Sequence, residues 1–204
     1  MSRVRFTTAR SVFETFPELA TKSAVAPTDD PPILFLKNLS AREKFEDAVA
    51  FCAHLLPRRE AVWWACGSAR AFLGDLVQGQ VGGLLAAETW VHEPNDKNRL
   101  LALQIGTGSD NSDPLTWLAL AAGWSGGMLS SSPNPPVPVP HYLTARAVRI
   151  AILLSARHIK SPERPQRMRA CIAEGVKLAE PDDDSRRGPA DTAGGNRTRR
   201  FDSA

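Results

Sequence analysis

A chain of 204 residues with 43% hydrophobic and 23% charged side chains lies in the ordinary range of folded globular proteins. At this length, folding buries roughly 70% of the surface that the unfolded chain exposes, so neither disulfide bonds nor a metal ion is needed for stability. The net charge is only +3, but residues 141–204 hold 13 of the 25 Lys and Arg and 8 of the 22 Asp and Glu, so the basic character belongs to the last third.

The cysteines and the apolar stretches indicate a reducing, aqueous compartment. The three cysteines are odd in number and each lies in an apolar segment, which is typical of buried, reduced thiols: Cys52, Cys66 and Cys171. No stretch reaches the roughly 18 to 20 apolar residues of a membrane span, and the N-terminus alternates arginine with Thr and Phe instead of forming a signal sequence. We therefore expect a cytoplasmic protein with no membrane contact.

Patterns that start helices recur along the chain. Ser11 with Glu14, and Ser40 with Glu43, have the Ser-x-x-Glu spacing in which each side chain caps a backbone donor of the other residue. Three further pairs place a capping oxygen before a proline, which fits the first turn of a helix: Asp30–Pro31, Asp113–Pro114 and Ser161–Pro162.

The clearest helix covers residues 45–56, where apolar residues recur at spacings of three and four, and Pro57 ends it. A helix over 59–73 should fold back on it, because only two residues join them. A short helix is expected near 31–38, with a buried strand at 33–36 as the alternative. Further helices are expected over residues 79–92, 95–105, 114–124, 141–160 and 163–179. The sequence therefore predicts an all-α fold, a compact array of antiparallel helical hairpins.

Two segments lack helical patterning. Residues 125–141 contain three consecutive serines and five prolines, which predicts an extended loop. This loop could dock on an aromatic groove in polyproline II geometry, but we favour a strap lying on the protein's own surface. Residues 181–204 have almost no apolar side chains and are expected to be a disordered tail. Residues 1–180 would then form a single helical domain.

No catalytic or metal-binding motif is present, so we expect no enzyme activity, no metal and no cofactor. Ser125 lies in Gly-Trp-Ser-Gly-Gly, which departs from the Gly-x-Ser-x-Gly elbow. Cys52 and His54 are two apart on a helix and point about 200° away from each other, so they cannot pair. An enzyme would need dispersed residues such as His141, Glu60 and Ser125, which stays as an alternative function.

A basic surface is predicted on the helix over 141–160. Four cations fall within an arc of about 80° at 100° per residue: Arg146, Arg149, Arg157 and Lys160. The next element extends this surface through Arg164, Arg167 and Arg169. The stripe could meet an acidic protein face or nucleic-acid phosphates, or be a solvated face. Nucleic-acid binding is the weaker alternative, because no aromatic side chains interleave for base stacking.

Trp63 and Trp64 are adjacent on one predicted helix and diverge by about 100°, so only one can point fully into the core. A partly exposed tryptophan would be a large, rigid anchor for an interface. Packing of both between neighbouring helices is the interpretation that we favour slightly.

Three blocks in this order resemble an uncharacterised proteobacterial family: LLPRREAVWWA at 55–65, AAETWV at 86–91, and a third from Trp117 that ends in WSGG at 124–127. The resemblance spans about residues 10–178. Members of that family tend to be encoded beside type VI secretion components, including spike-tip and effector-adaptor genes. The resemblance implies a helical cytoplasmic accessory protein and supplies no catalytic residues.

We therefore expect a non-enzymatic helical adaptor that binds another protein, which the resemblance suggests is a type VI secretion effector or spike component. The expected contact residues lie on a helical hairpin, a neighbouring loop and a charged rim: Arg58, Arg59, Trp63, Trp64, Trp124, Ser125, Gly126, Gly127, Arg146 and Arg149. Arg58 and Arg59 could instead cap the carbonyl end of the preceding helix.

Overall fold

The computed structural model describes residues 5–21, 23–77, 82–129 and 137–180. These residues form ten α-helices, two short 3₁₀ helices and no strand, so the prediction of an all-α fold is confirmed. The α-helices are α1 (Ala9–Thr15), α2 (Pro17–Ala20), α3 (Pro32–Ala41), α4 (Phe45–Leu55), α5 (Arg58–Leu73), α6 (Gly82–His92), α7 (Asp96–Thr107), α8 (Pro114–Gly123), α9 (Leu143–Ala156) and α10 (Arg164–Ala179). The 3₁₀ helices are η1 (Gly74–Val77) and η2 (Ser161–Glu163).

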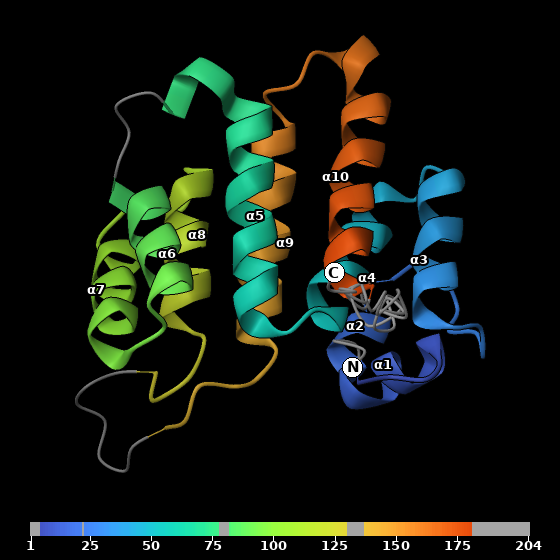
Figure 1. Cartoon of the computed structure of the whole chain (residues 1–204), viewed down its shortest axis with the longest axis horizontal. Helices are drawn as coiled ribbons and strands as arrows, with labels where there is room; N and C mark the ends of the chain where they lie inside the picture. Colours follow the sequence, from blue (N-terminus) through green and yellow to red (C-terminus); the bar gives the residue numbers. More distant parts are fainter. Residues whose placement is uncertain (1–4, 22, 78–81, 130–136, 181–204) are drawn as a thin grey trace, which may run out of the picture.

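Helix α9 lies at the centre of the molecule. Figure 1 places α6, α7 and α8 at one end, α5 and α9 in the middle, and α10, α4 and α3 at the other end, with α1 and α2 below them. Helix α9 packs against α4, α5 and α8. Its buried residues are mostly small: Thr144, Ala145, Ala147, Val148, Ala151, Ile152, Ser155 and Ala156. Small side chains let neighbouring helix axes approach closely, so three helices can pack on one.

Helix α9 is shorter than predicted, which breaks up the expected basic stripe. Tighter backbone bonds end the helix at Ala156: the amides of Arg157, His158 and Ile159 each donate to the carbonyl three residues back, at 3.1, 3.1 and 3.2 Å. The chain therefore turns before Lys160. The expectation of one helix over 141–160 carrying all four cations is wrong.

Both expected capping boxes are also wrong. Helix α1 is capped by Thr8, whose Oγ1 accepts from the Ser11 amide at 3.2 Å, so Ser11 is the third helical residue instead of the cap. Ser40 lies in the last turn of α3, which is longer than expected, and α4 begins after Lys44 without a side-chain cap. The cap at Asp113 is confirmed, because its carboxylate accepts from the Leu115 amide at 2.8 Å.

The strand alternative for residues 33–36 is wrong, because α3 covers them. The expected hairpin of α4 and α5 is not confirmed, since α5 packs mainly on α9 and α6. At the ends of the proline-rich segment, the Leu129 amide donates to Val137 O at 2.9 Å. Residues 130–136 of that segment and the expected tail, 181–204, lie outside the described residues.

Helices α7 and α8 pack with their backbones in close contact at two glycines. A Cβ atom on Gly123 would lie 2.6 Å from the Cα of Leu103, and one on Gly106 would lie 2.7 Å from Cγ of Leu120. Such distances leave no room for any side chain at these positions. The approach of these two helices therefore depends on glycine.

Gly123→Ala should lower the free energy of unfolding by about 1–3 kcal/mol, because the added methyl group would overlap the α7 backbone. Gly67→Ala is the matched control, since that helical glycine has nothing within 4 Å of an added Cβ. It should raise the free energy of unfolding by up to about 1 kcal/mol. Urea unfolding followed by circular dichroism measures the free energy of unfolding of both variants. Equal changes in the two variants would contradict the close contact between α7 and α8 at Gly123.

Candidate functional site

Arg58 and Arg59 begin α5 and hold carbonyl oxygens at the ends of other helices. Arg58 Nη1 donates to Ser125 O, just after α8, at 2.6 Å. Arg59 Nε donates to Val91 O, in the last turn of α6, also at 2.6 Å. Positive charge is favourable at the carboxyl end of a helix. The two arginines thus cap α8 and α6 instead of the preceding helix.

The loop over residues 124–127 is also tied into the fold. Arg99, from α7, donates through Nη1 to Gly123 O at 3.2 Å. Gly127 has a φ of 71°, and a Cβ there would lie 2.5 Å from Arg99 Nη2, so only glycine fits. Trp124 O accepts from the hydroxyl of Thr144 at 2.9 Å. These contacts give the WSGG block a structural role, in joining α8 to α9.

Arg146 and Arg149 lie on α9 in different surroundings. Arg146 is exposed. Arg149 turns toward α4, where its Nη2 lies 3.9 Å from Glu46 Oε2, and only 23% of its side chain is exposed. Its Nε is buried without a hydrogen-bond partner among the described residues. Arg149 is therefore mostly withdrawn from the charged rim that the sequence predicted.

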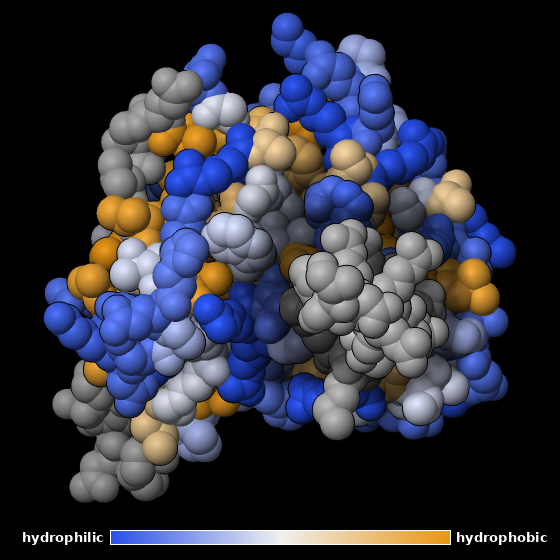
Figure 2. Space-filling view, in the orientation of Figure 1, coloured by the Kyte–Doolittle hydropathy of each residue, from blue (hydrophilic) through white to orange (hydrophobic). Residues whose placement is uncertain are grey.

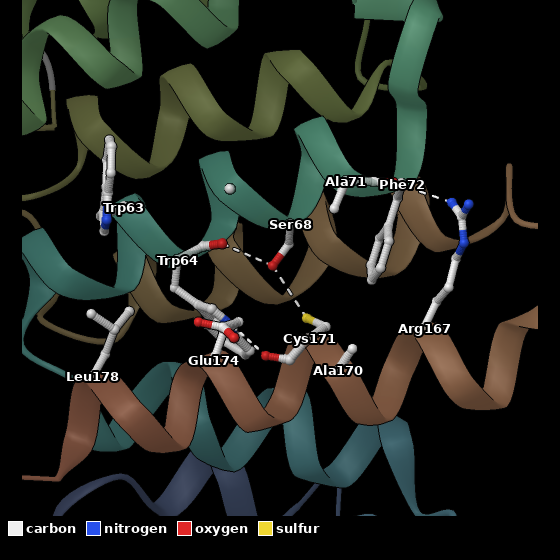
Figure 3. A pocket seen from close by; sticks show the side chains of 11 residues that line it. Trp63, Trp64, Ser68, Ala71, Phe72, Arg167, Ala170, Cys171, Glu174 and Leu178 are labelled. Atoms are coloured by element: carbon white, nitrogen blue, oxygen red, sulfur yellow. Dashed lines mark hydrogen bonds between the residues drawn. The ribbon is translucent and has the colours of Figure 1, made fainter.

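Trp63 and Trp64 have opposite environments, so the expectation that both pack in the core is wrong. Trp64 is 3% exposed, and its Nε1 donates to Cys171 O on α10 at 2.8 Å. Trp63 is 44% exposed. Its ring packs edge-to-face against the ring of His92, with 5.6 Å between the two ring centres. Figure 3 shows the two side chains leaving α5 in different directions, with Trp64 directed toward α10.

A groove with a cavity of about 490 Å³ runs between α5 and α10. It is lined by Trp63, Trp64, Gly67, Ser68, Ala71, Phe72, Arg167, Ala170, Cys171, Glu174 and Leu178. Trp63 and Leu178 stand at one end of the groove, and Phe72 and Arg167 at the other (Figure 3). The middle carries small side chains on both helices, so the groove is open there and largely apolar.

The thiol of Cys171 in this groove is held in its protonated form. Burial raises the pKa of Cys171 to about 12. Ser68 Oγ donates to Trp64 O at 2.8 Å and lies 3.2 Å from Cys171 Sγ, so the hydroxyl accepts from the thiol. Burial raises the pKa values of Cys52 and Cys66 as well. All three cysteines are buried and free, as the sequence predicted.

A second exposed apolar area lies on α6 and α7. Leu85 on α6 and Leu100 and Leu101 on α7 are exposed. Figure 2 shows hydrophobic side chains at the surface of this end of the molecule. Unlike the groove, this area has no tryptophan among its exposed side chains.

A second cavity, of about 670 Å³, lies where α5 and α9 begin. It is lined by Arg5, Thr15, Phe16, Ala53, His54, Leu56, Pro57, Arg58, His141, Thr144 and Ala145. Of these, the sequence singled out Arg58 as a contact residue and His141 as one member of a dispersed enzyme site. Glu60 instead lines a different hollow beside Trp63, so neither of these two cavities brings His141 and Glu60 together.

His54 was missed as a site residue, although a histidine within an apolar helical run is a signal. Its side chain is 6% exposed, and Nδ1 donates to Ala50 O at 2.8 Å. Nε2 is buried without a hydrogen-bond partner among the described residues, as are Glu18 Oε1 and Arg149 Nε. Nε2 and Glu18 Oε1 lie 3.6 Å apart, too far for a good hydrogen bond.

Burial lowers the pKa of His54, and the nearby positive charges of Arg149 and His141 lower it further. The Ala50 carbonyl and Glu18 act in the opposite direction but are outweighed. The ring is therefore neutral near pH 7, with a hydrogen on Nδ1 and a lone pair on Nε2.

Comparison with known proteins identifies one family. A model described as a family of unknown function, DUF6931, matches residues 35–179, more than half of the chain and including both helices of the groove. No curated protein and no solved structure matches the chain. In the described part of the chain, no helix is long and apolar enough to cross a membrane. The same part contains no group of three or more His, Cys, Asp or Glu that could hold a metal ion.

The protein should lose stability as the pH falls, because the pKa of His54 is lower in the folded state than its ordinary value of 6.5. Below pH 6.5 the unfolded chain binds a proton there that the folded chain does not, so the free energy of unfolding falls, by at most about 1.4 kcal/mol per pH unit. Urea unfolding at pH 7.5 and 5.5 measures this effect. His54→Gln should reduce the difference, whereas His158→Gln, at an exposed position, should not. If the free energy of unfolding changes equally between the two pH values in wild type and in both variants, His54 is not the group responsible.

Proposed function

We propose that this chain, which belongs to the DUF6931 family of unknown function, is a helical adaptor that binds an amphipathic helix of another protein in the groove between α5 and α10. One observation carries the proposal: Trp63, a large rigid side chain that is 44% exposed, stands at the end of an open apolar groove. Exposed tryptophans beside apolar pockets are typical anchors of protein interfaces.

The dimensions of the groove fit a helix. Along α10, Arg167 and Leu178 are eleven residues apart, which corresponds to about 16 Å or three helical turns. Gly67, Ala71 and Ala170 line the middle of the groove. Apart from the backbone of its own helix, nothing in the described part of the chain lies within 4 Å of a Cβ built on Gly67, so the described structure leaves space above it. An amphipathic helix placed there could bury its apolar face against both helices, as in other helix-in-groove complexes.

Trp63 would extend the contact surface beyond the groove. It also lines a neighbouring hollow with Arg59, Val91 and His92, and Leu178 lines both the groove and this hollow. The Trp63 ring is supported by His92 without being covered by it. A partner helix that ends against Trp63 would bury this ring between itself and α6.

The charges at the groove favour one direction of the bound helix. Arg167 stands at one end, and Glu174 lies nearer the other, close to Leu178. A helix carries partial positive charge at its amino end and partial negative charge at its carboxyl end. We therefore propose that the partner's amino end lies toward Glu174 and its carboxyl end toward Arg167.

The partner class that we propose is a type VI secretion effector or spike component. Support for it comes from the three sequence blocks that resemble a family encoded beside such components. One of the two groove helices carries part of a block, because LLPRREAVWWA includes the start of α5 and Trp63.

Trp63→Ala should weaken binding of such a partner by about thirtyfold, or 2 kcal/mol, because the proposed anchor is removed without disturbing buried Trp64. The partner is first recovered with the tagged chain from the cells that encode it, and then purified. Isothermal titration calorimetry with the wild type and each variant measures the affinity.

Leu101→Ala is the control, because Leu101 is 48% exposed but lies on α7, away from the groove. It should leave the affinity unchanged. A partner that binds wild type and Trp63→Ala equally would overturn the groove as the site, and loss on Leu101→Ala alone would move the site to α7. Recovery of no secretion component by folded wild-type protein would overturn the partner class.

A further inference from the structure

We propose that the cavity where α5 and α9 begin is a binding site for a small organic anion, whose carboxylate or phosphate group is held between the starts of these two helices. This site is separate from the groove proposed to bind a partner helix. The two proposals do not depend on each other.

Two long helices begin at this cavity without a side-chain cap. Helix α5 has 16 residues and follows Pro57, and α9 has 14 residues and follows Tyr142. Neither helix has a side-chain hydrogen bond at its N-cap. Pro57 and Arg58 line the cavity from one helix, and Thr144 and Ala145 line it from the other. Helix starts favour anions, because their first amide groups carry partial positive charge and lack partners within the helix; in α9 one of them, the Leu143 amide, already donates to Pro140 O at 3.1 Å.

Two arginines that line the cavity bring positive charge to it. Arg5 and Arg58 line it together with the imidazole rings of His54 and His141. Arg58 uses Nη1 for the Ser125 carbonyl, which leaves its other donors for a ligand. Glu18 lies beside His54, next to the cavity. Glu60, in the first turn of α5, lines the hollow beside Trp63.

The buried ring of His54 is the independent observation that points to a ligand. Its Nε2 has no hydrogen-bond partner among the described residues, although the side chain is only 6% exposed and lines the cavity. Buried polar atoms are normally paired, so an unpaired one calls for a further partner such as a water molecule or a ligand, and we propose a ligand here. In the protonated ring, Nε2–H could donate to an anion, and Glu18 at 3.6 Å would help to hold the proton.

The shape of the cavity favours an anion attached to an organic group. A volume of about 670 Å³ exceeds that of a bare oxyanion and falls within the range of small-molecule sites. The Phe16 ring stands 5.0 Å from the ring of His54 and 5.4 Å from that of His141, forming an aromatic wall. Ala53 and Leu56 add apolar surface. The ligand would place its charge at the helix starts and its apolar part against this wall.

Binding should be coupled to protonation of His54. Burial, Arg149 and His141 lower the pKa of this ring in the free protein, and Glu18 and the Ala50 carbonyl partly oppose them. An anion near Nε2 would raise the pKa again, so the ring takes up a proton as the anion binds. Affinity should therefore rise severalfold as the pH falls from 7.5 to 5.5.

Sulfate and benzoate are suitable probes, because both keep their charge over this pH range. Each is titrated into the full chain, with sodium chloride at matched ionic strength as the reference, and followed by amide chemical shifts. We expect saturable shifts at the starts of α5 and α9. Saturation by sulfate alone would indicate a phosphate-type ligand, and saturation by benzoate alone a carboxylate.

Three variants complete the test. Arg5→Gln, at an exposed position, should weaken binding severalfold, and His54→Gln should abolish the increase in affinity at low pH. Arg157→Gln is the control, an exposed arginine at the far end of α9, and should bind like wild type. The proposal is overturned if neither probe saturates, if the shifts lie elsewhere, or if Arg157→Gln weakens binding as much as Arg5→Gln.

Discussion

The close packing of three helices around α9 is the constraint on which the rest of the structure depends. Ala147 and Ala151 on this helix are completely buried, and their small size lets α4, α5 and α8 approach the same axis. This packing brings the start of α9 beside the start of α5, which creates the second cavity. It also fixes the rotation of α5, so that Trp64 faces α10 while Trp63 faces outward.

The groove between α5 and α10 exists because one large side chain separates the two helices. Trp64 fills the space between them, and a Cβ on Gly175 would lie 3.0 Å from its Cε2 and 2.5 Å from Cys52 Sγ. Farther along the groove the facing residues are small, Gly67 and Ala170 among them, and leave the space between the helices open. The same helix pair therefore supplies both a tight core contact and an open surface.

The sequence predicted the helices well, because each apolar stripe repeats with the period of a helix facing a core. It predicted their ends less well, because the spacing of Ser40 and Glu43 does not show that α3 continues through Ala41. The bond from Arg58 to Ser125 joins residues 67 positions apart, and no local pattern could predict it. An uncharacterised family was expected and is found; the link to secretion stays a proposal.

The unequal surroundings of two neighbouring tryptophans give the chain a built-in optical probe. Indole emission shifts with the polarity of its surroundings, so Trp63 emits from a partly aqueous environment and Trp64 from an apolar one. A quencher dissolved in water would reach the first ring and spare the second. Once the other three tryptophans, Trp90, Trp117 and Trp124, are replaced by phenylalanine, occupation of the groove and loosening of the core would thus leave different spectral signatures, readable without attaching a dye.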